Sequence, residues 1–491
     1  MSDQRTVAKL DRRPFAEIMF AIPAQRFAIT CAISTEETMP VVTEFAMRMI
    51  YTCGTVGPAQ LQTFFGFSDK EASAVIRTLL DEGLVRWEEE QLALTPQALE
   101  RFLESPDKVP RCFRIQEWTG DVFFELISFR PIKRGSARSR ALVELRVPDS
   151  KKESKTIYWA ERAFQENFRE ICRKRRAEIY KISEMDAGER TSLSLPCNFT
   201  VSIDGRCEIQ RSIPDATLEE SLEFSAAISD ALAKGVRSPN KGLAEMFSRF
   251  KIDLPFECLT AGEFDLARYL DYVYVLGRNP YPARARPFLG SPFLRDNRKA
   301  IIDQLGAIPE RSEEAIPTSE SLPPICWLAP NVPLWGRTTA TRNFIQHMDR
   351  LVKGSAESPT GSVDEEPDER DEVAVTTIVN SSQVLDPKSR AAYRAAIPGG
   401  VDLDTTVLDG KIELFWVPGE LVVVLYHYHA DHPIPIPVGF ISTDPDHLSR
   451  VRDLIVNDAI GSRPAYDLTP GTGGFGKEST YRVQKFKEYK L

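Results

Sequence analysis

Residues 38–103 carry the pattern that most constrains the fold of this chain, because short helical segments and a hairpin follow one another there within about 65 residues. Apolar residues recur at helical spacing through residues 41–50, and Gly54 follows them. Ser68 and Glu71 have the S-x-x-E spacing of a capping box, in which each side chain satisfies a free backbone N–H. The predicted helices span 40–53, 58–65, 68–82 and 96–103, and the predicted hairpin strands span 84–87 and 92–94.

This order of elements resembles the winged helix-turn-helix superfamily. The stretch LLDEGLV at 79–85, followed by LALTP at 92–96, is typical of that superfamily. The resemblance covers under a fifth of the chain. It implies a module whose third helix reads DNA bases through side chains at its start.

The charges of this module do not favour DNA readout. Asp69 and Glu71 lie at the start of the third helix and glutamates occupy 88–90 at the wing tip, so both places would repel phosphate. Lys70 and Arg77 are the basic candidates on the third helix. We therefore expect a scaffold or protein-docking role for this module, with DNA contact as the alternative.

A stronger electrostatic signal lies downstream, in two clusters of cations. The candidate nucleic-acid-binding residues there are Arg130, Lys133, Arg134, Arg138, Arg140, Arg173, Lys174, Arg175 and Arg176. Aromatic residues, among them Phe129, Tyr158 and Trp159, are near in sequence. Cations bind phosphates and aromatic rings stack on bases, so the clusters favour nucleic-acid binding. A solvated loop and cations at a helix C-terminus are the alternative interpretation.

The remaining pattern predicts a mixed α+β chain of several domains. The expected segments are an N-terminal β arm (1–37, with strands at 15–22 and 26–34), the winged helix (38–105), a β-rich mixed domain with the basic loop (106–215), a mainly helical region (216–352), an acidic disordered linker (353–372) and a small α/β domain with a glycine-rich basic tail (373–491). Within the β-rich domain we expect strands at 123–129 and 141–147, a helix at 157–176, and a hairpin at 199–211 that turns at Asp204-Gly205.

Histidines near the C-terminus suggest a second kind of site. His427, His429, Asp431 and His432 resemble the H-x-H-x-D-H motif of the metallo-β-lactamase family, which implies zinc and an activated water. The only later histidine is His447, whereas that family has further ligands downstream. The alternative is a strand end that places His427 and His429 on one face.

These observations lead to one main functional hypothesis and two alternatives. The main hypothesis is a non-catalytic component of a larger cytosolic machine, for example a phage-defence machine, that binds nucleic acid or a partner protein and has no cofactor. The net charge of −9 speaks against a chain coated in positive charge, but it allows a local basic surface. A metal-dependent hydrolase or nuclease, and a transcriptional regulator, are the alternatives. Scattered cysteines and the lack of a long apolar run suggest a cytoplasmic protein without a membrane span.

Overall fold

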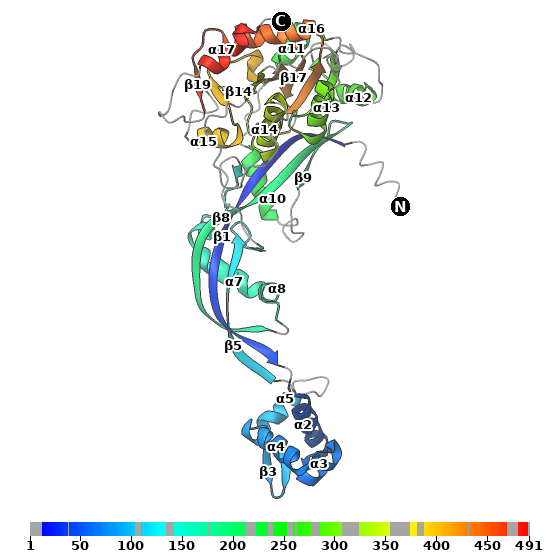
Figure 1. Cartoon of the computed structure of the whole chain (residues 1–491), viewed down its shortest axis with the longest axis vertical. Helices are drawn as coiled ribbons and strands as arrows, with labels where there is room; N and C mark the ends of the chain where they lie inside the picture. Colours follow the sequence, from blue (N-terminus) through cyan, green and yellow to red (C-terminus); the bar gives the residue numbers. More distant parts are fainter. Residues whose placement is uncertain are drawn as a thin grey trace. The chain divides into compact units, whose positions relative to one another are not determined.

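Two compact units make up the chain in the computed structural model. Unit 1 comprises residues 1–23, 135–150 and 191–491, and unit 2 comprises residues 24–134 and 151–190. The structure describes residues 12–489 except 38, 104–109, 111, 134–141, 175–176, 212–221, 234–238, 253–258, 261–262, 277–284, 307–323, 354–373, 381–386, 431 and 469–479. Both units contain helices and strands, so the mixed α+β class is confirmed (Figure 1). None of the described helices is both long enough and apolar enough to cross a membrane.

A long antiparallel pair of strands forms the centre of unit 2. Strand β1 (Arg12–Glu37) pairs with β5 (Cys112–Glu125) in a register that runs from Ala24 opposite Glu125 to Glu37 opposite Cys112. Alternate side chains of β1 are buried, among them Phe27, Ile29 and Cys31, as expected for a strand with one covered face. The other elements outside residues 38–103 are β6 (Pro131–Ile132), α6 (Ser150–Ser154, which begins in unit 1), α7 (Thr156–Glu166), α8 (Phe168–Ile171) and the first part of β8 (Glu178–Ser202).

Two expectations for these segments were wrong. Residues 15–34 form part of one continuous strand rather than two strands separated by Pro23. Pro23 lies between the residues of β1 that pair with β7 (Val143–Glu144) and those that pair with β5. Proline has no backbone N–H to donate, and neither of these two ladders requires a donor at this position. The helix expected at 157–176 ends at Ile171, and residues from Glu178 onward are a strand.

Residues 39–103 fold into a small helical body with a three-stranded sheet. The elements are α2 (Val41–Cys53), β2 (Thr55–Val56), α3 (Pro58–Phe65), α4 (Asp69–Asp81), β3 (Val85–Glu88), β4 (Gln91–Leu94) and α5 (Pro96–Leu103). The sheet order is β2-β4-β3. Ile50, Leu61, Leu79 and Leu92 lie in one core beneath the helices, and none of the four is exposed. The helices and hairpin expected here are therefore present, within a residue or two at their ends.

Unit 1 is built on an eight-stranded mixed sheet with the order β12-β18-β17-β16-β13-β14-β15-β19. The strands are β12 (Ala285–Leu289), β13 (Ile325–Leu328), β14 (Val375–Asn380), β15 (Gly400–Leu403), β16 (Ile412–Val417), β17 (Leu421–Tyr428), β18 (Ile436–Ser442) and β19 (Ala465–Asp467). Neighbours β13, β14 and β15 run parallel, and the other neighbouring pairs are antiparallel.

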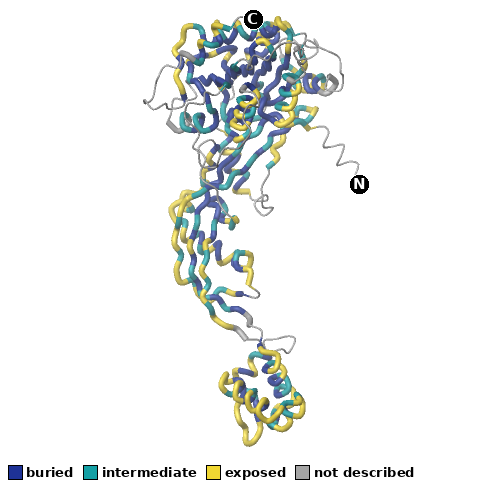
Figure 2. The backbone as a smooth tube through the Cα atoms, viewed as in Figure 1, coloured by how far each residue is buried: buried dark blue, intermediate teal, exposed yellow. Residues whose placement is uncertain are grey.

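Helices cover both faces of this sheet, which explains why its central strands are buried along their whole length (Figure 2). On one face Trp327 and Phe415 share a core with Phe344 of α14. On the other face Phe440 contacts Phe250 of α11, and Trp416 contacts Phe486 of α17. The helices of unit 1 are α10 (Leu222–Ala233), α11 (Gly242–Phe250), α12 (Leu266–Leu276), α13 (Arg295–Gly306), α14 (Thr339–Lys353), α15 (Pro387–Ala396), the 3-10 turn η3 (Leu408–Gly410), α16 (Pro445–Asp453), the π-helical η4 (Leu454–Ile460) and α17 (Thr480–Glu488).

The domain boundary that we expected at residues 353–372 does not separate two domains in the structure. The region expected to be mainly helical supplies β12 and β13, which pair with strands from beyond residue 373, so the two segments build one sheet. The acidic linker itself lies outside the described residues except for Lys353, as does the glycine-rich stretch at 471–479. The basic end of the tail belongs to α17.

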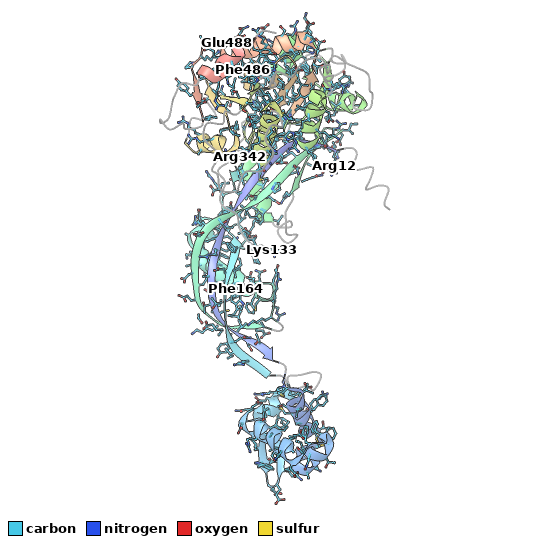
Figure 3. The ribbon with its side chains drawn as sticks, in the orientation of Figure 1. Arg12, Lys133, Phe164, Arg342, Phe486 and Glu488 are labelled. Atoms are coloured by element: carbon cyan, nitrogen blue, oxygen red, sulfur yellow. The ribbon has the colours of Figure 1, made fainter. Side chains whose placement is uncertain are left out.

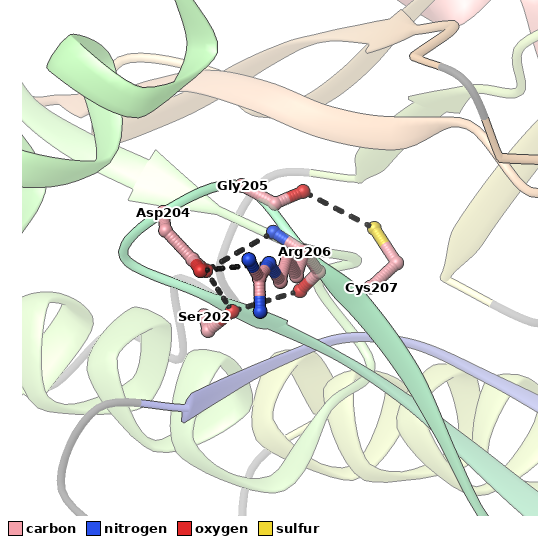
Figure 4. A network of polar contacts seen from close by, with 5 residues as sticks. All are labelled: Ser202, Asp204, Gly205, Arg206 and Cys207. Atoms are coloured by element: carbon pink, nitrogen blue, oxygen red, sulfur yellow. Dashed lines mark hydrogen bonds and ion pairs between the residues drawn. The ribbon is translucent and has the colours of Figure 1, made fainter.

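The hairpin of β8 and β9 (Cys207–Arg211) confirms the turn expected at Asp204-Gly205 (Figure 4). Gly205 has φ +81°, a left-handed conformation that glycine adopts without strain. The Asp204 carboxylate accepts a hydrogen bond from the backbone N–H of Arg206 at 3.3 Å and lies 3.1 Å from its guanidinium. The Ser202 hydroxyl also bonds the carboxylate and lowers the pKa of Asp204, so contacts within residues 202–206 stabilise this turn.

Candidate nucleic-acid interface

The loop after β5 is fixed by a buried carboxylate. The side chain of Glu125 is fully buried and accepts backbone N–H groups of Ile127, Ser128 and Arg130 at 2.8, 3.0 and 2.7 Å. Burial raises the pKa of Glu125, and these hydrogen bonds oppose that rise. The loop therefore has a defined shape, and it ends in Arg130 and Lys133, both exposed (Figure 3).

This loop packs against α6 and α7. The ring of Phe129 lies 6.4 Å from the ring of Trp159 on α7. The ammonium of Lys152 donates to the carbonyl of Ile127 at 2.9 Å and lies 5.6 Å from the centre of the Trp159 ring. Two segments that are 20 to 30 residues apart in sequence thus contact each other, and Lys152 lies at their contact.

Aromatic side chains lie among these cations. Tyr158 is 59 % exposed and meets Trp159 edge to face, with ring centres 5.5 Å apart. The guanidinium of Arg162 lies 5.8 Å from the Trp159 ring and pairs with Glu166 at 2.9 Å. We use the name Trp159 surface for Arg130, Lys133, Lys151, Lys152, Lys155, Tyr158, Trp159 and Arg162.

The Trp159 surface has a positive charge balance. Residues 126–133 and 150–162, which form it, contain six cations and two carboxylates. Clustered cations raise the local concentration of polyanions, and an exposed aromatic ring can stack on a base. Four cations of this surface were not predicted from the sequence: Lys151, Lys152, Lys155 and Arg162. The run of lysines just before Tyr158-Trp159 was the signal for them.

The second cluster of predicted cations lies elsewhere on unit 2. Arg173 and Lys174 are exposed and follow α8, and the Lys174 ammonium donates to Gln116 of β5 at 3.1 Å. The structure shows no contact that joins this pair to the Trp159 surface within the described residues. The remaining predicted cations, Arg134, Arg138, Arg140, Arg175 and Arg176, lie outside the described part of the chain.

The start of α4 is dominated by carboxylates. Ser68 accepts the N–H of Glu71 at 3.4 Å while Glu71 accepts the N–H of Ser68 at 2.9 Å, which confirms the capping box. These hydrogen bonds lower the pKa of Glu71 and so favour its charged form. Asp69 accepts a hydrogen bond from Gln62 at 2.7 Å. Lys70 and Arg77 are exposed on the same helix, but they share it with these anions.

The histidines at the C-terminal end of β17 and just after it contact different partners. His427 is buried and its Nε2 lies 2.7 Å from a Glu413 carboxylate oxygen, while the other oxygen of Glu413 accepts the Trp327 indole N–H at 3.0 Å. His432 lies edge-on to the rings of Phe15 and Phe199. No three His, Cys, Asp or Glu side chains of the described residues, which exclude Asp431, lie close enough to hold a metal ion. The backbone N–H of His429 donates to the side-chain oxygen of Asn240, and the carbonyl of His429 accepts from the side-chain amide of the same residue.

Comparison with known proteins gives no relative. No family model matches the chain, and neither a curated protein nor a solved structure matches it.

Proposed function

We propose that the protein is a non-catalytic component that binds the backbone of nucleic acid through the Trp159 surface. The observation that carries this proposal is the contact of Phe129 with Trp159 and of Lys152 with Ile127, because it joins the loop that carries Arg130 and Lys133 to the α6–α7 segment that carries the other cations. Lysine and arginine contacts to phosphates supply affinity without reading sequence. Tyr158, which is exposed beside these cations, offers a stacking platform for an unpaired base.

We further propose that residues 39–103 are a winged-helix module that docks a protein partner rather than reading DNA. The element order α2-β2-α3-α4-β3-β4-α5 with a sheet of three strands supports the module. Residues 39–103 carry nine carboxylates and five cations, and Phe64 and Trp87 are 66 % and 47 % exposed. An acidic surface with exposed aromatic side chains suits a basic protein partner and disfavours phosphate.

Fluorescence anisotropy with labelled 30-nucleotide single-stranded DNA, RNA and duplex DNA at low salt tests the proposal. The variant Lys133→Glu plus Lys155→Glu reverses two exposed cations of the Trp159 surface and should weaken binding about tenfold or more, because fewer phosphates are neutralised and fewer counterions are released. The matched control, Lys70→Glu plus Arg77→Glu, makes the same charge change on α4 and should leave the affinity within about twofold.

Two results would overturn this proposal. One is the absence of binding to all three probes at low salt. The other is the reverse pattern, in which the α4 variant loses affinity and the Trp159-surface variant keeps it, since that pattern would place the contact on the helix that a DNA-reading winged helix uses. Circular dichroism of both variants shows that a loss of binding does not come from unfolding.

A further inference from the structure

A groove of about 1070 Å³ lies in unit 1, beside the edge strand β12. Residues of β12, α13, the start of β1 and the turn between β16 and β17 line it. Figure 3 labels Arg12, which lies at the β1 side of this groove. Its volume lies slightly above the roughly 300–1000 Å³ that small-molecule sites occupy in proteins.

Three arginines line the groove, and they come from two strands. Arg12 and Arg13 belong to β1 and Arg286 belongs to β12. Arg12 pairs at 2.6 Å with Glu208, which is not part of the lining, and both side chains remain more than 40 % exposed. Arg286 is exposed and has neither an ion pair nor a hydrogen bond with any side chain in the described part of the chain. A planar guanidinium in a concave site is the protein group best suited to bind phosphate in a bidentate manner.

Three carboxylates line the same groove. Asp296 and Asp303 belong to α13, and Glu420 lies in the turn that precedes β17. Among the described side chains, none of the three forms an ion pair with an arginine of the groove. A ligand that carries both an anion and hydrogen-bond donors would complement the arginines and the carboxylates of this groove.

The floor of the groove is apolar and already formed. Phe288, Leu289, Leu294 and Ile441 line it and are each 4–6 % exposed. The amide of Asn297 on α13 donates to the carbonyls of Leu289 and Ser291 at 2.8 and 3.0 Å, which ties the helix to the end of β12. A site that needs little rearrangement loses less free energy on binding a ligand.

From this lining we propose that the groove binds a nucleotide. The phosphates would contact Arg286 and the two arginines of β1, the base would lie on the apolar floor, and the ribose hydroxyls or base amino groups would donate to the carboxylates. A nucleotide is a class of small molecule that presents an anion, a flat ring and several donors within one groove of this size. This site lies in unit 1 and is independent of nucleic-acid binding by the Trp159 surface of unit 2.

Isothermal titration calorimetry of the full chain with ATP and GTP tests the nucleotide site, with adenosine and inorganic phosphate as comparison probes. ATP or GTP should bind, and Arg286→Glu should weaken that binding about tenfold or more because a charge-assisted contact becomes a repulsion. The matched control Arg206→Glu alters an arginine of the β8–β9 turn that is 83 % exposed and does not line the groove, and it should bind as the unmodified protein does.

A second variant separates a nucleotide site from a simple anion site. Asp303→Ala should lower the affinity for ATP or GTP relative to that for phosphate, because it removes an acceptor for ribose or base donors, while the loss of one negative charge acts on both ligands in the same direction. The proposal is overturned if neither ATP nor GTP binds at about 1 mM, the weak end of specific affinity, if Arg286→Glu changes nothing, or if phosphate alone binds as tightly as ATP. Lys133→Glu plus Lys155→Glu should leave ATP binding unchanged, so failure of this site and failure of nucleic-acid binding are distinguishable.

Discussion

Individual buried polar residues in this protein form hydrogen bonds with neighbouring side chains. Ser442 and His447 illustrate this at the end of β18, where Oγ of Ser442 lies 2.9 Å from Nδ1 of His447 and both side chains are more than nine-tenths buried. Burial lowers the pKa of His447 below its ordinary 6.5, so the folded protein favours the neutral ring.

We predict that His447 makes the free energy of unfolding decrease in mild acid. The unfolded chain binds a proton at His447 with the ordinary pKa of 6.5 and the folded chain binds it more weakly, so the free energy of unfolding decreases as the pH falls through 6.5 towards the lowered pKa. Urea unfolding at pH 7.5 and pH 5.5 should show a larger loss for the unmodified protein than for His447→Gln. Equal losses for the two proteins would contradict this assignment.

Sequence patterns predicted some candidate site residues and not others. Arg130 and Lys133 were predicted because cations cluster visibly in the chain, and both are exposed in the structure. The partner of His427 could not be predicted, because Glu413 comes from the neighbouring strand through the pairing of β16 with β17. The role of Glu125 was hidden in the same way, since a buried carboxylate that accepts three backbone N–H groups looks like any surface glutamate in a sequence.

At the scale of elements, the close packing of β18 against β17 depends on one glycine, Gly439. A Cβ at Gly439 would overlap the carbonyl of Val424 on β17, and the backbone of Gly439 also bonds the buried hydroxyl of Tyr269 from α12. The Tyr269 hydroxyl also lies 3.3 Å from the carbonyl of Phe288 on β12, so one position connects three strands and a helix.

Gly439→Ala should therefore destabilise unit 1 by about 3 kcal/mol or more, because a clash with a backbone carbonyl in a packed sheet cannot relax. Gly205→Ala in the β8–β9 turn is the matched control: the site is open but φ is +81°, so the cost should be about 1–2 kcal/mol. Urea unfolding measures both. A loss at Gly439 no greater than that at Gly205 would contradict the packing described for β18.

Elements with local signals were predicted, whereas the short strands β12 and β13 were not. The Ser68–Glu71 capping box and the Asp204-Gly205 turn involve residues close in sequence, and both are confirmed. Strands β12 and β13 are only five and four residues long, and their partners lie about 50 to 150 residues away. The part of β8 in unit 2 has few buried side chains, so its sequence lacks the alternation that identifies a strand.

At the scale of the whole molecule, charge is divided between regions rather than spread evenly. The net charge of −9 includes the acidic residues 39–103, with nine carboxylates and five cations, while the segments of the Trp159 surface carry six cations against two carboxylates. Total charge is therefore a poor guide to binding here, and the local surface is the relevant quantity. Strands β1 and β8 each contribute residues to both units, so neither unit is formed from one continuous segment of the chain.

The salt dependence of nucleic-acid affinity tests the central claim most directly. If the cations of the Trp159 surface contact phosphates, the logarithm of the binding constant for single-stranded DNA should fall linearly with the logarithm of salt concentration, with a slope of roughly −3 for about four contacts. Lys133→Glu plus Lys155→Glu should reduce the magnitude of this slope by about half, and Lys70→Glu plus Arg77→Glu should leave it unchanged. An affinity that does not depend on salt, or a slope that only the α4 variant changes, would contradict binding through the Trp159 surface.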